Sequence, residues 1–533
     1  MEKYAKIIIA LLLAGAVCSC SRIPNYIPPD SDESSESASG ASAPETSKPD
    51  EFLTSEFTVT KKDYAAKLNA EGGVLNGGEL IEEDEKPFDG KGFVRLNKGG
   101  SLSHIVTASA PQHYRVMIAA RSESGAAVSL KYSDMTQGTY YIPPYDESEF
   151  GASEYDFKYY AVDNVYLVSG SNTLKFTVDE GSADIDYLFV ESSSAVSENC
   201  YSVGNSCVNP KTSLAAVDLM QYLAELYGEK TLTAQNVTIG TNAEINAVFK
   251  ETGRYPAIRV GELAMTTLTD EERSKRAEAE TELALQWSSD GGICAYTWHW
   301  YSPNSLHGTA PRDFSLADAL ENENVSDTAM LGAAEIAALE ENDAINEELV
   351  ALLNDIDKIA EQLKKFDKLN IPLIFEPIPD ADSGLYWWGS DAESYKKLWT
   401  LAFDRLCLYH GLRNLIWVWN GSNIDYYPGN QFVDIMGQSF YERSKASFAG
   451  RFSALNDMDT ARKIQTVTAC DTLPNIDYMC RDNAMWLWAA LGSGEFLIDE
   501  NGRLVETYNN RTSLNYFYNH ELTITRDELK LPS

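Results

Sequence analysis

Basic side chains are scarce in this sequence, and their scarcity excludes one class of partner. The 533 residues include 43 lysines and arginines against 80 aspartates and glutamates, which gives a formal net charge of −37. A chain this acidic repels phosphate, so we expect no binding to nucleic acid. The charge suits a protein that stays soluble outside the cell and meets a neutral or cationic partner.

Histidine and regularly spaced cysteine are also scarce. The six histidines are scattered, and the six cysteines after residue 20 match no zinc-binding spacing. The sequence therefore gives no support to a metal-dependent hydrolase. In an oxidising setting, Cys200 could pair with Cys207, and Cys470 with Cys480, to close short disulfide loops.

Long apolar runs are nearly absent, and the one at the N-terminus is too short to span a bilayer. It covers residues 7–17 and follows Lys3 and Lys6, as in a secretory signal. Ser19-Cys20 follows this run, and a small residue before a cysteine resembles a bacterial lipoprotein cleavage box. We therefore expect a signal peptide over residues 1–20 and a lipid on Cys20. The alternative is a plain secretory signal. The lipid would anchor the protein on the outer side of a bacterial membrane surface.

Two compositional segments follow this predicted signal. Residues 21–50 are rich in Ser, Pro and acidic residues and have almost no large apolar side chains, which predicts a disordered linker. Residues 51–195 contain short alternating strands, such as residues 92–96, 114–118 and 172–176, and no amphipathic helix of useful length. This pattern predicts an all-β sandwich of the jelly-roll kind.

Short motifs in the predicted sandwich resemble carbohydrate-binding module family 35. They are residues 70–77 (AEGGVLNG), 90–94 (GKGFV), 170–174 (GSNTL) and 185–186 (ID). The resemblance implies sugar binding, commonly with structural calcium, and Glu71 and Asp186 fall at the family's acidic positions for that ion. Carboxylates suit calcium. The alternative is a spacer domain without a ligand.

From residue 196 to 533, helical patterns alternate with buried strands. A clear helix carries apolar residues at steps of three and four between Ile345 and Phe366. Eight such alternations predict an α/β (β/α)8 TIM barrel, whose functional residues lie at the carboxyl ends of the strands. The eight predicted strands are residues 231–235, 255–260, 292–298, 372–375, 414–419, 433–437, 464–468 and 484–488.

Aromatic residues gather near the ends of these predicted strands. Exposed rings are costly in water unless something stacks on them, which favours a sugar-binding cleft; the alternative is that the rings pack on one another as a cap. The candidate binding residues are Trp298, His299, Trp387, Trp388, Trp419, Tyr441 and Trp486.

The same region resembles glycoside hydrolase family 26 in several motifs along nearly its whole length. They are residues 252–257 (TGRYPA), 291–300 (GGICAYTWHW), 414–420 (NLIWVWN), 425–429 (DYYPG) and 433–435 (VDI). The resemblance implies a retaining endo-β-1,4-mannanase with no cofactor in the barrel. Such an enzyme has an acid/base glutamate after strand four and a nucleophilic glutamate after strand seven.

Both catalytic positions depart from that pattern. With residues 387–389 (WWG) setting the register, Asp380 stands at the acid/base position and is one methylene shorter than glutamate. Glu376 and Pro379 replace the arginine and histidine that the family motif carries before it. An error near 1 Å in such a reaction can cost about 100-fold in rate.

At strand seven, Cys470 and Pro474 set the register and place Ala469 at the nucleophile position. A methyl group cannot attack the anomeric carbon. Asp471 is a candidate substitute, although it stands two residues further along the strand. Ser439 also replaces an aspartate that the family usually carries before Tyr441.

These observations predict a cell-surface lipoprotein that binds mannan, glucomannan or galactomannan for partner glycan-degrading proteins without cleaving it. The first alternative is an active retaining endo-β-1,4-mannanase with relocated carboxylates. The second is a structural or adhesion protein that binds no sugar.

Overall fold

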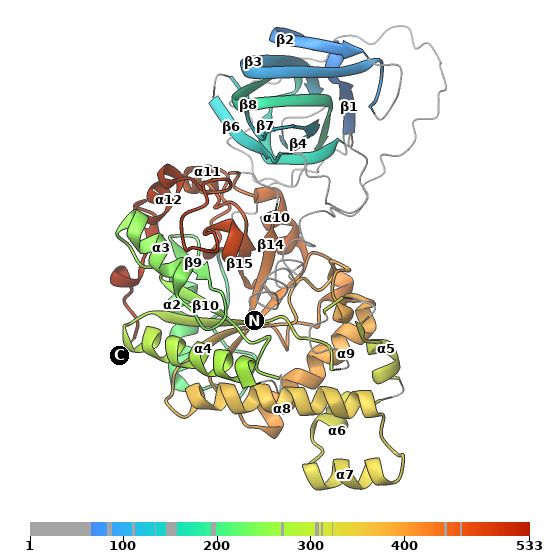
Figure 1. Cartoon of the computed structure of the whole chain (residues 1–533), viewed down its shortest axis with the longest axis vertical. Helices are drawn as coiled ribbons and strands as arrows, with labels where there is room; N and C mark the ends of the chain where they lie inside the picture. Colours follow the sequence, from blue (N-terminus) through green and yellow to red (C-terminus); the bar gives the residue numbers. More distant parts are fainter. Residues whose placement is uncertain are drawn as a thin grey trace. The chain divides into compact units, whose positions relative to one another are not determined.

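The computed structural model describes residues 65–82, 88–108, 112–133, 135–144, 157–192, 199–267, 271–303, 309–310, 313–321, 323–441, 445–458 and 461–532. Two compact units divide the chain near residue 195 (Figure 1). The predicted signal peptide, Cys20 and the predicted linker over residues 21–50 lie outside the described residues. No helix in the described ranges has both the length and the apolar character that a membrane span requires.

The first unit is all-β, as predicted, and every strand pairing in it is antiparallel. Its strands are β1 (Ala65–Asn69), β2 (Val74–Glu82), β3 (Gly92–Ala108), β4 (Gln112–Arg121), β5 (Ala126–Tyr132), β6 (Met135–Ile142), β7 (Lys158–Leu167) and β8 (Gly170–Ser192). The long β8 pairs with β1, β3, β4 and β5. Its alternate residues Leu174, Phe176 and Val178 are fully buried, as expected for strands with one face on a core.

The second unit is a closed barrel of eight parallel strands, which confirms the predicted fold class. In chain order the strands are β9 (Thr231–Asn236), β10 (Ile258–Glu262), β11 (Ile293–Trp298), β12 (Leu373–Pro377), β13 (Leu415–Asn420), β14 (Ile435–Phe440), β15 (Ile464–Cys470) and β16 (Trp488–Leu491). Pairing of β9 with both β10 and β16 closes the barrel. A short strand, β17 (Thr523–Ile524), adds to β9.

Helices connect and cover the barrel strands (Figure 1). They are α2 (Leu214–Leu226), α3 (Ala243–Thr252), α4 (Glu271–Ser289), α5 (Leu316–Ala319), α6 (Val325–Ala329), α7 (Ala333–Glu341), α8 (Glu347–Asp367), α9 (Ala392–Phe403), α10 (Ala449–Met458), α11 (Ile476–Arg481) and α12 (Arg511–Tyr518). The predicted helix between the third and fourth strands is α8. Asn346 caps its first turn, and Leu349, Ile356 and Leu363 are fully buried on one face.

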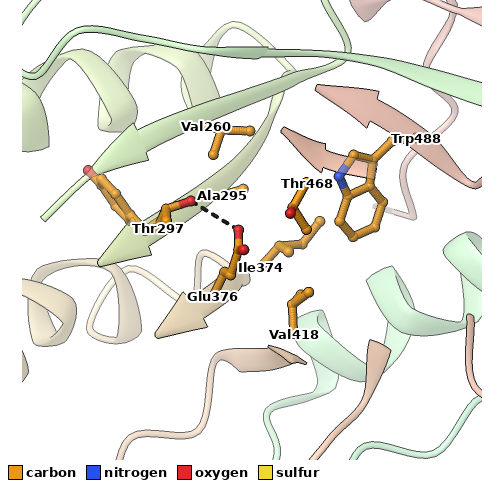
Figure 2. A pocket seen from close by; sticks show the side chains of 9 residues that line it. Val260, Ala295, Thr297, Ile374, Glu376, Val418, Thr468 and Trp488 are labelled. Atoms are coloured by element: carbon orange, nitrogen blue, oxygen red, sulfur yellow. Dashed lines mark hydrogen bonds between the residues drawn. The ribbon is translucent and has the colours of Figure 1, made fainter. Parts of the chain in front are cut away.

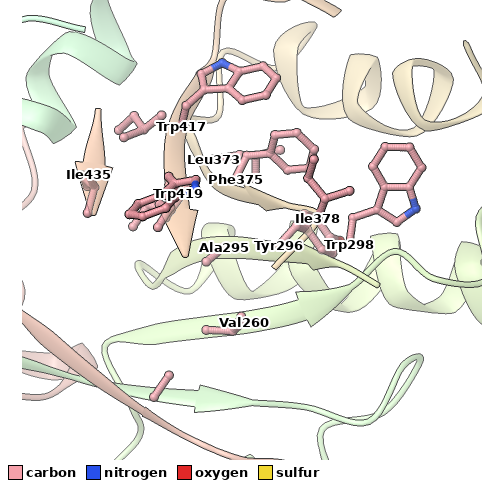
Figure 3. Packing of buried hydrophobic residues seen from close by; sticks show 14 of the residues in the cluster. Val260, Ala295, Tyr296, Trp298, Leu373, Phe375, Ile378, Trp417, Trp419 and Ile435 are labelled. Atoms are coloured by element: carbon pink, nitrogen blue, oxygen red, sulfur yellow. The ribbon is translucent and has the colours of Figure 1, made fainter. Parts of the chain in front are cut away.

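Large aromatic side chains fill the layer between the barrel strands and the helices, and Figure 3 shows part of this packing. Trp417 of β13 contacts Phe403 of α9 at a ring-centroid distance of 4.9 Å. Tyr296 of β11 contacts Phe366 of α8 at 5.6 Å. Successive residues of a strand point to opposite faces. The neighbours of these rings along each strand therefore point into the barrel.

Two predictions about this unit were wrong. The eighth strand was expected at residues 484–488, but β16 begins at Trp488, so Trp486 precedes the strand. The disulfides Cys200–Cys207 and Cys470–Cys480 do not form, because all six of these later cysteines are free. Cys470 lies in β15 and directs its thiol to the carbonyl of Ala490 in β16, 3.4 Å away, rather than to Cys480 on α11.

Candidate active site at the carboxyl ends of the barrel strands

Asn420, the last residue of β13, joins four barrel strands through its side-chain amide. The amide nitrogen Nδ2 lies 2.8 Å from Glu376 Oε1, 3.2 Å from Asp380 Oδ1, 2.8 Å from Ser439 Oγ and 2.9 Å from Thr468 Oγ1. An amide nitrogen carries two hydrogens, so it can donate to only two of these oxygens at a time. We call these five residues the Asn420 cluster.

Glu376 of β12 is buried within the barrel. The Thr297 hydroxyl donates to its Oε2 at 3.1 Å, and Figure 2 shows the two side chains directed toward each other. Burial raises the pKa of Glu376 to about 7, against the opposing effect of the Asn420 hydrogen bond. Glu376 also lines a cavity of about 10 Å³, which has room for about one water molecule.

Asp380 follows β12 on an unusual stretch of backbone. Ile378 and Asp380 have φ angles of 42° and 51°, in the left-handed region that is costly for residues other than glycine. The Asp380 side chain is partly exposed. Burial raises its pKa, while hydrogen bonding to Ser439 and the charge of His299 lower it. The loop thus holds a carboxyl group with an elevated pKa beside Ser439.

His299, one residue beyond β11, pairs with Glu262 at the end of β10. Its Nδ1 lies 2.5 Å from Glu262 Oε2, and its backbone N–H donates to Oε1 at 3.1 Å. Burial disfavours the protonated ring, but the Glu262 carboxylate outweighs burial and raises the pKa of His299 to about 9. The side chain is 36% exposed, so a cationic imidazole faces solvent at this end of the barrel.

Ala469 lies beside the Asn420 cluster on β15. A register shift after Gln438 of β14 pairs Ser439 with Ala469. The shift interrupts the regular alternation, because Thr468 directs its hydroxyl to Asn420 and the next residue, Ala469, pairs with Ser439, whose hydroxyl also lies beside Asn420. Asp380 and Ala469 are thus each adjacent to a member of the Asn420 cluster, Asp380 through its contact with Asn420 and Ala469 through its pairing with Ser439; their catalytic roles stay predictions.

Asp471 does not reach this place as an exposed acid. It is only 2% exposed, its backbone N–H donates to the Phe440 carbonyl at 3.1 Å, and its carbonyl accepts from Asn509 at 2.7 Å. A buried carboxyl is not available to a polysaccharide chain in an open cleft. Asp471 is therefore a poor substitute for a nucleophile.

Five of the seven predicted binding side chains are buried: Trp298, Trp387, Trp388, Trp419 and Trp486. Trp298 stacks on Trp300 at 4.1 Å, and Trp300 bonds Asp355 of α8, so both rings face the helix layer. Trp419 shares the outward face of β13 with Trp417, two residues earlier.

The other three tryptophans also contact protein rings rather than an open cleft. In the 3-10 turn η5 (Trp387–Gly389), Trp387 packs edge-on to Phe314 at 5.0 Å, and Trp388 stacks on Tyr386 at 4.4 Å. Trp486 lies between Phe440 and Phe452, on the amino-terminal side of β16. The expectation of exposed stacking faces thus fails for these five residues, and the alternative of mutual packing describes them.

His299 and Tyr441 are the two predicted binding residues that remain partly exposed. Tyr441 directly follows β14 and packs against Phe496 at 5.5 Å. The sequence missed Glu262 because the second strand was predicted to start three residues too early and to end at residue 260, whereas β10 runs from Ile258 to Glu262. The central position of Asn420 was also missed. The apolar residues 415–419 that precede it give no sign that its amide lies near four side-chain oxygens.

Glu71 and Asp186, the acidic positions predicted in the sandwich, both accept hydrogen bonds from backbone N–H groups. Glu71 Oε1 accepts the Lys91 N–H at 3.1 Å, and both oxygens of Asp186 lie 3.0 Å from the Asp89 nitrogen. Within the described ranges, no three His, Cys, Asp or Glu side chains are grouped in a way that could hold a metal ion.

Comparisons with known proteins agree with this architecture. The chain is 29% identical over 370 residues to a mannan endo-1,4-beta-mannosidase of Thermothelomyces thermophilus, covering 69% of this chain and 71% of the relative. It is 26% identical over 482 residues to mannan endo-1,4-beta-mannosidase A of a Piromyces species, covering 88% of this chain and 73% of the relative.

A crystal structure of a Podospora anserina β-(1,4)-mannanase, described as GH26-CBM35, shares the fold with a TM-score of 0.55 at 23% identity. The match covers 88% of this chain and 99% of that one. The glycosyl hydrolase family 26 profile matches residues 208–528, which is more than half of the sequence and includes all eight barrel strands. The chain therefore belongs to glycosyl hydrolase family 26.

Proposed function

We propose that this protein binds β-mannan through a family 26 barrel that no longer cleaves the glycan. The polysaccharide would be mannan, glucomannan or galactomannan, in keeping with the relatives named above, which are mannan endo-1,4-beta-mannosidases. The protein would hold the polysaccharide at a bacterial surface, through a lipid on Cys20, for other glycan-degrading proteins. The all-β unit would act as a second carbohydrate-binding module, similar to family 35.

Ala469 is the observation that carries this proposal. A retaining glycosidase needs one carboxylate to attack the anomeric carbon and a second carboxylic acid to protonate the leaving oxygen. Asp380 can supply an acid, and its raised pKa suits that role. On β15, however, the residue beside Ser439 presents a methyl group. Without a nucleophile, a glycosyl-enzyme intermediate cannot form.

The protein still has polar groups at this end of the barrel that suit sugar binding. His299 is cationic near neutral pH and partly exposed, and it is held in place by Glu262. Asp380 and Tyr441 are also partly exposed. Such groups can bond sugar hydroxyls without reacting with them.

Two assays on the full secreted chain test this proposal together. Affinity electrophoresis in gels containing glucomannan or galactomannan should retard the protein, and His299→Ala should reduce the retardation. Reducing-end analysis of the same polysaccharides should show no release above a buffer blank. Absence of retardation on every mannan would favour the structural or adhesion alternative instead.

A second candidate function, residual hydrolysis, is favoured by the position of Glu376. Glu376 Oε1 and Asp380 Oδ1 lie 2.8 and 3.2 Å from one nitrogen. They are thus at most about 6 Å apart, comparable with the roughly 5–5.5 Å of retaining enzymes. This glutamate could serve as a relocated nucleophile if the substrate reached it. Its burial beneath Asn420 argues against such access.

The variants Glu376→Gln and Asp380→Asn separate the two candidates. Under the binding proposal, the wild type and both variants are equally inactive and retain mannan binding. Under the hydrolase alternative, the wild type releases reducing ends and each variant loses that activity. Catalysis lost in Asp380→Asn but kept in Glu376→Gln would point to a third acid as nucleophile.

A further inference from the structure

The sandwich unit contains a surface pocket of about 420 Å³ that the barrel site does not involve. Its volume lies in the range of small-ligand sites, about 300–1,000 Å³. Strands β1, β4, β7 and β8 and the turn before β3 supply its walls. The pocket is lined by Lys67, Phe88, Asp89, Ala119, Phe157, Tyr159, Asp186 and Tyr187. We call it the sandwich pocket.

Charged groups form one wall of the sandwich pocket. The Lys67 ammonium forms an ion pair with Asp89 and lies 3.8 Å from the centre of the Tyr187 ring. Asp89 in turn donates its backbone N–H to the Asp186 carboxylate. Lys67 and Asp89 keep 34% and 41% of their side-chain surface exposed, so they can still bond a ligand.

Aromatic rings form another part of the lining. Tyr159 is 37% exposed, and Phe157 is partly exposed. The Tyr159 and Tyr187 hydroxyls hydrogen-bond to each other, and their rings meet edge-on at 6.0 Å. Tyr159 is therefore held in one orientation before any ligand arrives. Fixed rings beside hydrogen-bonding groups match a sugar, which has apolar C–H faces and polar hydroxyl edges.

Calcium does not fit the acidic positions beside this pocket. The ion needs six to eight oxygen ligands, whereas Glu71 Oε1 and both Asp186 oxygens already accept backbone N–H groups, and Glu71 Oε2 is the one oxygen of these two carboxylates that is buried without a hydrogen-bond partner. Lys67 further places a positive charge against Asp89, and a cation there would have to displace it. The described residues thus provide an ammonium group in place of a metal ion.

We propose that the sandwich pocket binds a short stretch of a neutral hexopyranose chain without calcium, with Tyr159 as the stacking platform and the Lys67–Asp89 pair as the hydroxyl-binding group. The inference rests on the proposed mannan-binding function and assigns part of that binding to a defined place. Two carboxylates against one ammonium leave the pocket with an excess of negative charge, which disfavours uronic acids.

Calorimetric titration of the full chain with mannohexaose, in EDTA and in calcium chloride, tests this inference. Tyr159→Ala and Lys67→Met should each remove one binding site per chain, or weaken it by about tenfold or more. Tyr166→Ala is the matched control, because Tyr166 lies on the same strand, is also 37% exposed and does not line the pocket. Calcium should change none of these results.

The possible failures of the inference and of the proposed function differ. If the chain binds mannohexaose but Tyr159→Ala and Tyr166→Ala behave like the wild type, the pocket assignment is wrong and mannan binding stands. If EDTA abolishes the Tyr159-dependent site, Lys67 does not replace calcium. If mannohexaose does not bind, cellohexaose and a galacturonic acid hexamer are titrated next. Tyr159-dependent binding of cellohexaose would retain the inference; its absence, or a preference for the uronic acid, would overturn it.

Discussion

Two buried glutamates of the barrel differ in the groups that surround their carboxylates. Glu280 of α4 and Arg259 of β10 are each 1% exposed and form a bidentate ion pair. Glu376 is nearly as deeply buried but is held by the Asn420 amide and the Thr297 hydroxyl. Its pKa accordingly rises to about 7, chiefly through burial. Carboxyl groups with strongly shifted pKa values are common at functional sites.

Breaking the buried ion pair between Arg259 and Glu280 should cause the largest loss of stability. Arg259→Met leaves Glu280 buried without its partner, which typically costs about 3–5 kcal/mol. Arg254→Met is the control, because it removes an ion pair with Asp527 whose partners are 35% and 61% exposed, and such pairs are worth less than about 1 kcal/mol. Thermal unfolding of the barrel should show a large decrease in Tm only for the first variant. Equal decreases in Tm for the two variants would contradict the expected difference between a buried and an exposed ion pair.

Introducing a carboxylate at position 469 of β15 should test whether hydrolysis is limited by a missing nucleophile. Ala469→Glu places a carboxylate next to Ser439, within reach of the substrate face near Asp380. We expect mannan hydrolysis to rise by about 100-fold over Ala469→Gln, short of a full enzyme because Asp380 is shorter than glutamate. Reducing-end release measures the effect. Equal rates for the Glu and Gln variants would show that position 469 does not face the anomeric carbon.

Replacing the ionisable carboxyl group of Glu376 should stabilise the barrel at alkaline pH. A raised carboxyl pKa means that the folded protein binds the proton more tightly than the unfolded chain does. The stability from protonated Glu376 is therefore complete below pH 4.5 and is lost as the pH rises to about 7 and beyond. Glu376→Gln should eliminate this loss, a difference of about 3 kcal/mol between pH 4.5 and pH 8. Parallel Tm profiles of the barrel transition for wild type and variant would contradict the raised pKa.

The smallest effect is expected at Trp486. Because this ring lies between Phe440 and Phe452 ahead of β16, Trp486→Phe should change mannan affinity by no more than about twofold. His299→Ala, at the partly exposed end of β11, should weaken binding by more. Affinity electrophoresis of the two variants compares them. A greater loss from Trp486→Phe would restore the original assignment of that residue to the cleft.

The sequence was sufficient to predict the barrel because eight alternating strands and helices leave few other folds. It was not sufficient to tell which face of each strand a tryptophan occupies. Strand β13 is buried on both sides, so Trp417, Val418 and Trp419 carry no polar alternation that would distinguish inward from outward. The apolar run from Ala484 to Leu491 likewise hides the start of β16, and Trp486 was misplaced for that reason.

The placement of residue 380 just after β12 and of residue 469 within β15 was predictable, because the ends of these two strands follow from local sequence. Asp380 contacts the Asn420 amide, and Ala469 pairs with Ser439. The raised pKa of Glu376 was not predictable, since it requires the depth of burial and the partners from β11 and β13. Contacts between residues far apart in the sequence determine such a pKa, and the sequence alone does not show them.

The central claim is that the barrel does not hydrolyse mannan, and isotope incorporation tests it most directly. Wild-type protein is incubated with mannohexaose in water enriched in oxygen-18, and the products are examined by mass spectrometry. The account predicts intact hexaose and no shorter oligosaccharide with an oxygen-18 reducing end. Labelled products from the wild type that disappear in Glu376→Gln would contradict it and show that hydrolysis requires the Glu376 carboxyl group.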